Sequence, residues 1–396
     1  MVAIHGWVAP GLDRVREEFE TNFAARGEVG ASVCVKLAGQ TVVDLWGGLA
    51  DPGTGRPWQR DTLVDFYSAG KPLVATLVLR LVDAGLIRLD DPVASLWPEF
   101  AVGGKGSATI RHALSHRAGV PAISAPLTND DLWSWEAMTA ALAATPAWFE
   151  PGSRLVYHTN TYGHLAGEIA RRVTGQMPGT LLAVIAADLG ADVHFGVPEG
   201  DLDRCATVIF GAARSPASRD AAVEPRDRPD APIGPQERTE ASMIRLGYFN
   251  PPGYSSFGVV NTVEWRRAEV PSTNGHGSAA GLAAFYDGML EPGRILSAPL
   301  TEEATRVQSE GDCPVLGEPA AFGLGFVPTS PRRRFGPNPG AFGHFGTGGA
   351  VGFADPARSV AFGYVMNDVI PRWQSTRNRA LVDALYAGLA GGRSPH

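Results

Sequence analysis

A serine and a lysine three positions apart, Ser68 and Lys71, are the first candidates for catalytic residues in this sequence. They open an apolar stretch whose periodicity predicts a helix over residues 71–84. Pro72 must lie in the first turn of that helix, where its missing N–H costs little. Ser68 is therefore expected at the start of the helix, one turn from Lys71 and on the same face. This pairing predicts a serine nucleophile with an amine as its base, whereas the plain alternative is an N-capping serine and a solvated lysine.

Two further segments could complete an acyl-transfer site, which also needs a proton donor and an oxyanion site. Tyr157 follows a Pro-Gly turn and a short extended run, so its ring could project beside the serine. The alternative is a core tyrosine with a satisfied hydroxyl. The glycine-rich residues 343–349 would let the backbone approach a ligand closely. The N–H of Thr347 could then join that of Ser68 in an oxyanion hole, and His344 could contact the substrate.

These three segments resemble the motifs of the serine beta-lactamase and penicillin-binding-protein superfamily. Within it, the chain is most similar to class C beta-lactamases and family VIII carboxylesterases. Residues 68–71 (Ser-Ala-Gly-Lys) match S-x-x-K, and Tyr157 matches the tyrosine of Y-x-N. Residues 344–346 (His-Phe-Gly) match the K-T-G element, which is commonly H-x-G in the esterase branch. The resemblance runs from about residue 10 to residue 390.

The resemblance implies a role for each matching residue. Ser68 would attack an ester carbonyl, with Lys71 and Tyr157 as a coupled proton-transfer pair. The N–H groups of Ser68 and Thr347 would hold the oxyanion. Tyr157 would pass the proton to the leaving alkoxide and then activate the water that releases the acid.

Two departures from the beta-lactamase pattern favour esters over lactams. Thr159 stands where beta-lactamases carry asparagine, with Asn160 one position late, and His344 replaces the lysine. In that family the asparagine and lysine help to hold the amide and carboxylate of a beta-lactam. We therefore expect a carboxylesterase for short to medium acyl chains, with weak or no beta-lactamase activity. The expected substrate-binding residues are His344, Phe345, Gly346, Thr159, Trp148 and Phe249.

Several alternatives remain open at this point. The same site could serve an acyltransferase, a D-amino peptidase or amide hydrolase, or a true beta-lactamase, and a non-catalytic binding scaffold is a further possibility. An α/β-hydrolase is not supported, because the sequence has no G-x-S-x-G motif. The nine histidines form no H-E-x-x-H motif, so no metal is expected in the site.

Composition bounds the partners and the location. Of the 396 residues, 44% are hydrophobic and 19% charged, which is ordinary for a globular protein. A net charge of −7 disfavours nucleic acid or an anionic membrane as the main partner. Cys34, Cys205 and Cys313 lie far apart without metal-ligand spacing, and no cofactor is expected.

The N-terminal residues lack signal-peptide features and no segment is long and apolar enough to span a membrane, so we expect a cytoplasmic enzyme acting on a small-molecule ester. The sequence indicates no oligomeric state.

We expect these residues to be carried by an α+β fold like that of beta-lactamases and transpeptidases. An antiparallel sheet built from both ends of the chain would carry flanking helices, with a mainly helical domain inserted. We expect the sheet domain to comprise residues 1–75 and 315–396, and the helical domain to comprise residues 76–314, with a surface excursion at 211–242. Expected helices include 10–26, 129–145 and 376–389, a short helix closing on Gly119, and strands at 31–37, 41–46, 321–327, 341–345, 350–354 and 359–366.

Overall fold

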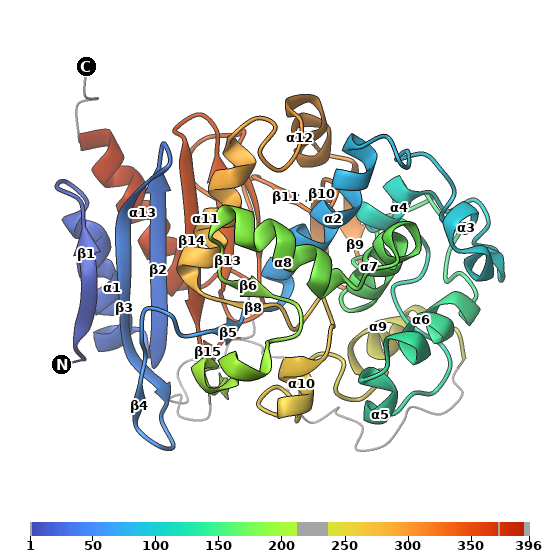
Figure 1. Ribbon diagram of the computed structural model, residues 1–396, viewed down its shortest axis with the longest axis horizontal. Helices are drawn as coiled ribbons and strands as arrows, with labels where there is room; N and C mark the ends of the chain where they lie inside the picture. Colours follow the sequence, from blue (N-terminus) through green and yellow to red (C-terminus); the bar gives the residue numbers. More distant parts are fainter. Residues whose placement is uncertain (1, 212–236, 371–372, 392–396) are drawn as a thin grey trace.

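The computed structural model describes residues 2–211, 237–370 and 373–391, and within them the main feature is an eight-stranded antiparallel sheet (Figure 1). The strand order is β1-β3-β2-β14-β13-β12-β11, with β4 paired to β3. Strands from the two ends of the chain meet where β2 pairs with β14. The strands are β1 (Ile4–Val8), β2 (Gly30–Leu37), β3 (Gln40–Asp51), β4 (Arg56–Pro57), β11 (Val327–Pro328), β12 (Phe342–Phe345), β13 (Val351–Asp355) and β14 (Val360–Met366).

Helices cover both faces of this sheet, which explains why every residue of β14 is buried. On one face lies α11 (Ala279–Leu290), and a Cβ atom added at Gly352 of β13 would meet the ring of Tyr286 from that helix. The neighbouring Val351 faces the opposite side, because successive residues of a strand alternate. There it lines a cavity together with residues of α13 (Thr376–Gly391). Helix α1 (Asp13–Ala25) lies beside α13 (Figure 1).

The remaining helices lie mainly beside the sheet, on the right of Figure 1. Their centre is α2 (Lys71–Asp83), which packs against α7 (Thr161–Thr174) and α8 (Pro178–Leu189). Ahead of α2 lies the 3-10 turn η1 (Tyr67–Gly70). The other helices are α3 (Val93–Leu96), η2 (Pro98–Ala101), α4 (Ile110–Leu114), α5 (Asn129–Leu132), α6 (Trp135–Ala144), η3 (Glu199–Arg204), α9 (Glu240–Phe249), α10 (Val263–Arg267) and α12 (Ala298–Thr305). Short strands are β5 (Val64–Asp65), β6 (Val193–His194), β7 (Ile209–Phe210), β8 (His276–Gly277), β9 (Ser309–Cys313), β10 (Glu318–Phe322) and β15 (Asp368–Val369).

The predicted α+β architecture and the predicted strands at 31–37 and 41–46, which are β2 and part of β3, are confirmed. The helix predicted over residues 129–145 is wrong as one helix, because α5 ends at Leu132 and α6 begins at Trp135. Ser134 starts the second helix by accepting a hydrogen bond from the N–H of Ala137, 3.1 Å away. The helix expected to close on Gly119 ends earlier, at Leu114.

The strand predicted over residues 321–327 is also divided, into β10 and β11. Gly325, between them, has a φ of +88°, which breaks the extended conformation. Residues 212–236 of the expected surface excursion lie outside the described residues, and Glu240 already begins α9. The division into a sheet domain and a helical domain stays a proposal; α11, from the expected helical part, packs on the sheet.

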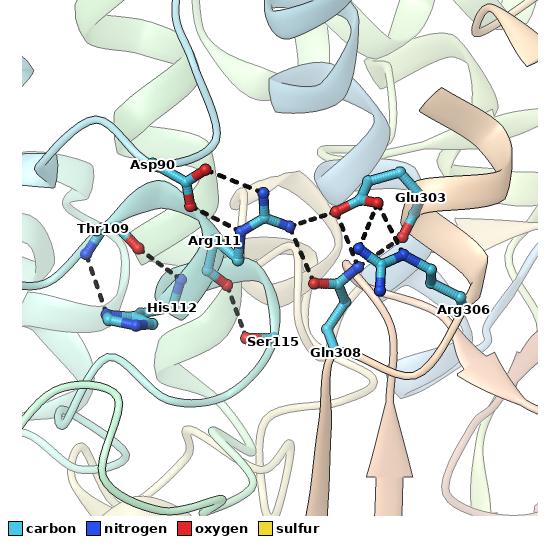
Figure 2. Close-up of polar contacts among 8 residues, drawn as sticks. All are labelled: Asp90, Thr109, Arg111, His112, Ser115, Glu303, Arg306 and Gln308. Carbon is cyan, nitrogen blue, oxygen red and sulfur yellow. Dashed lines mark hydrogen bonds and ion pairs between the residues drawn. The ribbon is translucent and has the colours of Figure 1, made fainter. Parts of the chain in front are cut away.

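A cluster of ion pairs stabilises the position of α4, the helix that ends at Leu114, two residues before His116. Figure 2 shows Arg111 between Asp90 on one side and Glu303 of α12 with Gln308 on the other. The guanidinium Nε lies 2.7 Å from Asp90 Oδ1, and Nη1 lies 2.5 Å from Glu303 Oε1. These partners raise the pKa of Arg111, so the cation is permanent. The cluster holds α4 against α12 and thereby fixes the chain that leads into the site.

In the part of the chain that the structure describes, every helix is too short or too polar to cross a membrane.

Candidate active site

Ser68 lies in η1, immediately ahead of α2, so the prediction that it stands at the head of that helix is close to what the structure shows. The residue before it, Tyr67, has a φ of +51°, which is rare for a residue with a large side chain. Two contacts hold it there: its N–H donates to Asp65 Oδ1 at 2.8 Å, and its hydroxyl lies 3.1 Å from Ser256 Oγ. A non-glycine residue in this region stores roughly 1–3 kcal/mol of strain. The surrounding structure therefore forces the turn that presents Ser68.

Lys71 is completely buried and meets three oxygen atoms. Its Nζ lies 3.0 Å from Ser68 Oγ, 2.7 Å from the carbonyl oxygen of Thr159 and 3.1 Å from that of Ser272. Desolvation holds the pKa of Lys71 well below its ordinary value. The two carbonyls accept hydrogen bonds from the amine, which also lies within hydrogen-bond distance of the Ser68 hydroxyl.

Tyr157 lies beside this pair, with Lys71 Nζ 4.9 Å from the centre of its ring. The ring is fixed by His116, 4.7 Å away, and by Phe322, 5.4 Å away, while its backbone N–H donates to Cys313 Sγ at 3.3 Å. Its hydroxyl is buried and makes no hydrogen bond of good geometry among the described residues. Burial raises the pKa of Tyr157, whereas a weaker hydrogen-bonding interaction with the side chain of Ser68 lowers it. The Tyr157 hydroxyl therefore lies near that of Ser68 and still has bonding capacity for a substrate atom.

The end of β12 approaches the serine turn closely. A Cβ atom added at Gly346 would lie only 2.1 Å from the carbonyl oxygen of Phe66, two residues ahead of Ser68. Only glycine permits this approach without a shift of the backbone. It brings the next residue, Thr347, towards the serine. Among the described residues, neither the N–H of Ser68 nor that of Thr347 donates to another protein group.

His344, on β12, is fully buried and its ring lies 6.4 Å from that of Tyr157. Nδ1 lies 2.7 Å from the carbonyl oxygen of Phe345, so the ring proton resides on Nδ1. Nε2 is left as a buried acceptor without a partner among the described residues. Burial lowers the pKa of His344 to about 3, with a smaller effect from Lys71. The histidine is therefore neutral and cannot replace the charge of a lysine.

Thr159 contacts Lys71 through its backbone, whereas Asn160 uses its side chain for hydrogen bonds within the protein. Thr159 contributes its carbonyl oxygen to Lys71, as described above. The side chain of Asn160 is fully occupied within the protein. Its Nδ2 donates to the carbonyl oxygen of Gly247 and to Ser255 Oγ, both at 2.8 Å, and its Oδ1 accepts from Thr273 Oγ1 at 2.8 Å. The amide of Asn160 is therefore not available to a substrate.

The other expected substrate-binding side chains lie in two places. Trp148 and Phe249 are half-buried and pack against the same small apolar cluster, which includes Val156, the neighbour of Tyr157. Phe345 does not contribute its side chain to the serine side of β12, because its ring stacks on Phe335 at 4.5 Å. Gly346 contributes through the close approach of its backbone.

Three contacts of the site were not predicted from the sequence. Trp373 meets Tyr157 edge-on, with 5.2 Å between ring centres, and Arg333 lies 4.2 Å above the ring of Trp373 while it pairs with Glu318. The third is the carbonyl oxygen of Ser272 on Lys71. The nearest signal for Ser272 was the Gly- and Ser-rich run that follows it, and nothing in the sequence indicated Trp373 or Arg333.

No cluster of three or more histidine, cysteine or acidic side chains suited to a metal ion occurs within residues 2–211, 237–370 and 373–391.

A serine next to a buried lysine and a tyrosine, at the border of an antiparallel sheet and a helical region, is the arrangement of the beta-lactamase-like class of proteins. The sequence model described as Beta-lactamase matches residues 15–386, and this chain belongs to the beta-lactamase family. The expected beta-lactamase-like fold is thereby confirmed.

Named relatives and solved structures agree with this assignment. The esterase/beta-lactamase LipL of Mycobacterium tuberculosis (strain ATCC 25618 / H37Rv) is 32% identical over 93% of this chain and 83% of its own length. The esterase EstB of Burkholderia gladioli is 27% identical over 96% of this chain and 95% of its own length. The crystal structure of a family VIII carboxylesterase is 36% identical, with a TM-score of 0.86, over 98% of this chain and 100% of that one.

We predict that His344 stays neutral throughout the range from about pH 5 to pH 8. Its NMR signals, assigned by their loss in His344→Gln, should not titrate there. The folded pKa lies below the unfolded value of about 6.5, so its contribution to stability is complete above pH 6.5 and is lost as the pH falls towards 3. The Tm should therefore fall between pH 7 and pH 5, and less so in His344→Gln. A titration midpoint between pH 6 and pH 7 would contradict the assignment.

Proposed function

We propose that this protein hydrolyses carboxylic esters through an acyl intermediate on Ser68. The observation that carries the proposal is the fully buried Lys71, whose Nζ lies 3.0 Å from Ser68 Oγ and whose pKa is lowered by desolvation. A lysine whose pKa is lowered by burial is suited to act as a general base. The relatives named as esterases, including one solved structure at 36% identity, support the same reaction.

In the first half of the reaction, the Ser68 oxygen attacks the ester carbonyl carbon while Lys71 Nζ takes the hydroxyl proton. The carbonyl oxygen gains negative charge, which the N–H groups of Ser68 and Thr347 stabilise. The close approach of Gly346 to Phe66 supports this assignment, because Thr347 follows Gly346 and Ser68 lies two residues after Phe66.

The tetrahedral intermediate collapses when the leaving alkoxide receives a proton. Tyr157 is suited to pass it on, because its raised pKa keeps the phenol protonated and its hydroxyl makes no hydrogen bond of good geometry among the described residues. Lys71 resupplies the proton that it took from Ser68. In the second half, water enters in place of the alcohol and loses a proton to the same pair. Its oxygen attacks the acyl carbon, and the acid leaves as Ser68 regains its proton.

We propose esters rather than beta-lactams as the main substrates. His344 is neutral and buried, and the amide of Asn160 is already hydrogen-bonded three times within the protein. Neither can hold a beta-lactam as a lysine and a free asparagine do. Trp148 and Phe249 offer an apolar wall next to Val156, which favours short to medium acyl chains. Thr159 contributes its carbonyl oxygen to Lys71, and we propose no substrate contact for the side chain of Phe345.

The decisive experiment compares turnover of p-nitrophenyl esters of increasing chain length with turnover of nitrocefin. We expect kcat/KM for esters of short to medium chains to exceed that for nitrocefin by at least about a hundredfold. Ser68→Ala should lower ester turnover by at least about a thousandfold with an unchanged Tm, because no other group on the site can form the acyl intermediate. Faster turnover of nitrocefin, or full activity in folded Ser68→Ala, would contradict the proposal.

A second prediction concerns the close approach of β12. Gly346→Ala should lower kcat/KM for the best ester by at least about tenfold, mainly through kcat, because the added Cβ pushes the oxyanion donors apart. Gly340→Ala is the matched control, since a Cβ atom there meets nothing within 4 Å. Equal activity of both variants, each folded by circular dichroism, would show that the approach does not position the oxyanion donors.

A further inference from the structure

A cavity of about 450 Å³ lies on the other face of β12, between the loop of residues 331–337 and helix α13. This volume is within the range of about 300–1,000 Å³ for small-molecule sites. The cavity is lined by Phe345 of β12, whereas Ser68, Lys71 and Tyr157 do not line it. Successive residues of a strand point to opposite faces, so His344 and Phe345 belong to different sites.

The packing of the loop builds this cavity. Phe335 is fully buried and stacks on Phe345 at 4.5 Å, and its N–H donates to Thr329 Oγ1 at 3.0 Å. Gly336 has a φ of +125°, and a Cβ atom there would lie 2.2 Å from the ring of Tyr386 on α13. The loop therefore packs tightly at two successive residues, with Phe335 against β12 and Gly336 against α13.

The lining combines an apolar floor with a cationic rim. Phe335, Phe345, Val351 and Val382 form the buried floor. The exposed rim residues are Arg332, Arg334 and Arg379, against a single carboxylate, Asp383.

The charges on the rim are only partly neutralised. Arg332 lies 3.5 Å from Glu318, which also pairs with Arg333. Arg379 donates to the neutral Gln374 at 3.0 Å, and Arg334 forms no ion pair within the described residues. The N-terminal turn of the 16-residue helix α13 borders the cavity as well and adds partial positive charge.

We propose that this cavity is a second binding site, for a small carboxylate with an apolar tail. Guanidinium groups bind a carboxylate through two parallel N–H donors, and the floor accepts the hydrocarbon chain. Acids of this class are the products of the proposed ester hydrolysis. The link between the cavity and the reaction product rests on the proposed function, whereas the binding site itself does not. The cavity also borders the catalytic side, because Asn378 donates to the carbonyl oxygen of Gly349 at 2.9 Å and to that of Trp373 at 3.0 Å.

The test is isothermal titration calorimetry with sodium octanoate, acetate and 1-octanol as probes. We expect octanoate to bind saturably, with acetate and octanol at least about tenfold weaker. The double variant Arg334→Gln/Arg379→Gln should bind octanoate at least about tenfold more weakly and keep its ester turnover in the absence of octanoate. Arg14→Gln, an exposed arginine on α1 outside the cavity lining, is the control and should bind normally.

The proposal is overturned if octanoate does not bind, if octanol or acetate binds as well as octanoate, or if the double variant binds octanoate like the unchanged protein. These outcomes are separate from a failure of the proposed function. That failure would appear as a lack of ester turnover, whatever the calorimeter records.

Discussion

Lys71 carries its amine into the protein interior, where no carboxylate of the described residues pairs with it. Its partners are a serine hydroxyl and two backbone carbonyl groups. Desolvation therefore lowers the pKa of Lys71, and its amine faces Ser68. Each carbonyl comes from a different part of the chain, Thr159 ahead of α7 and Ser272 ahead of β8, so this environment of Lys71 exists only when the helical region is assembled around α2.

The sheet supplies the other half of the site. Pairing of β2 with β14 joins the two ends of the chain, and β12 then runs with Gly346 against the backbone of Phe66. Strain at Tyr67, held by Asp65 and Ser256, fixes the serine turn from the opposite side. Ser68 is thus held between a strand end and a helix start.

The sequence was sufficient for the residues that carry a local signal. Ser68 and Lys71 share a helix turn, and Pro72 marks its start, so their contact followed from spacing. Tyr157 was expected near the serine because it matches the second of three motifs that occur in a fixed order along the chain. No local sequence pattern could predict its distance from Ser68. Trp373, Arg333 and the carbonyl of Ser272 could not be predicted, because their contacts arise where distant segments meet. The break between α5 and α6 was missed since Ser134 fits a continuous helical pattern as well as a new cap.

The most direct test of the account is acid-quench mass spectrometry of the protein mixed with p-nitrophenyl butyrate. If Ser68 is the nucleophile, a rapidly quenched sample carries one butyryl group, and digestion locates it on the peptide that contains Ser68. The label should be absent from Ser68→Ala. Turnover of the ester with a butyryl group on another residue, or with none at all under conditions that trap the intermediate in a known serine esterase, would contradict it.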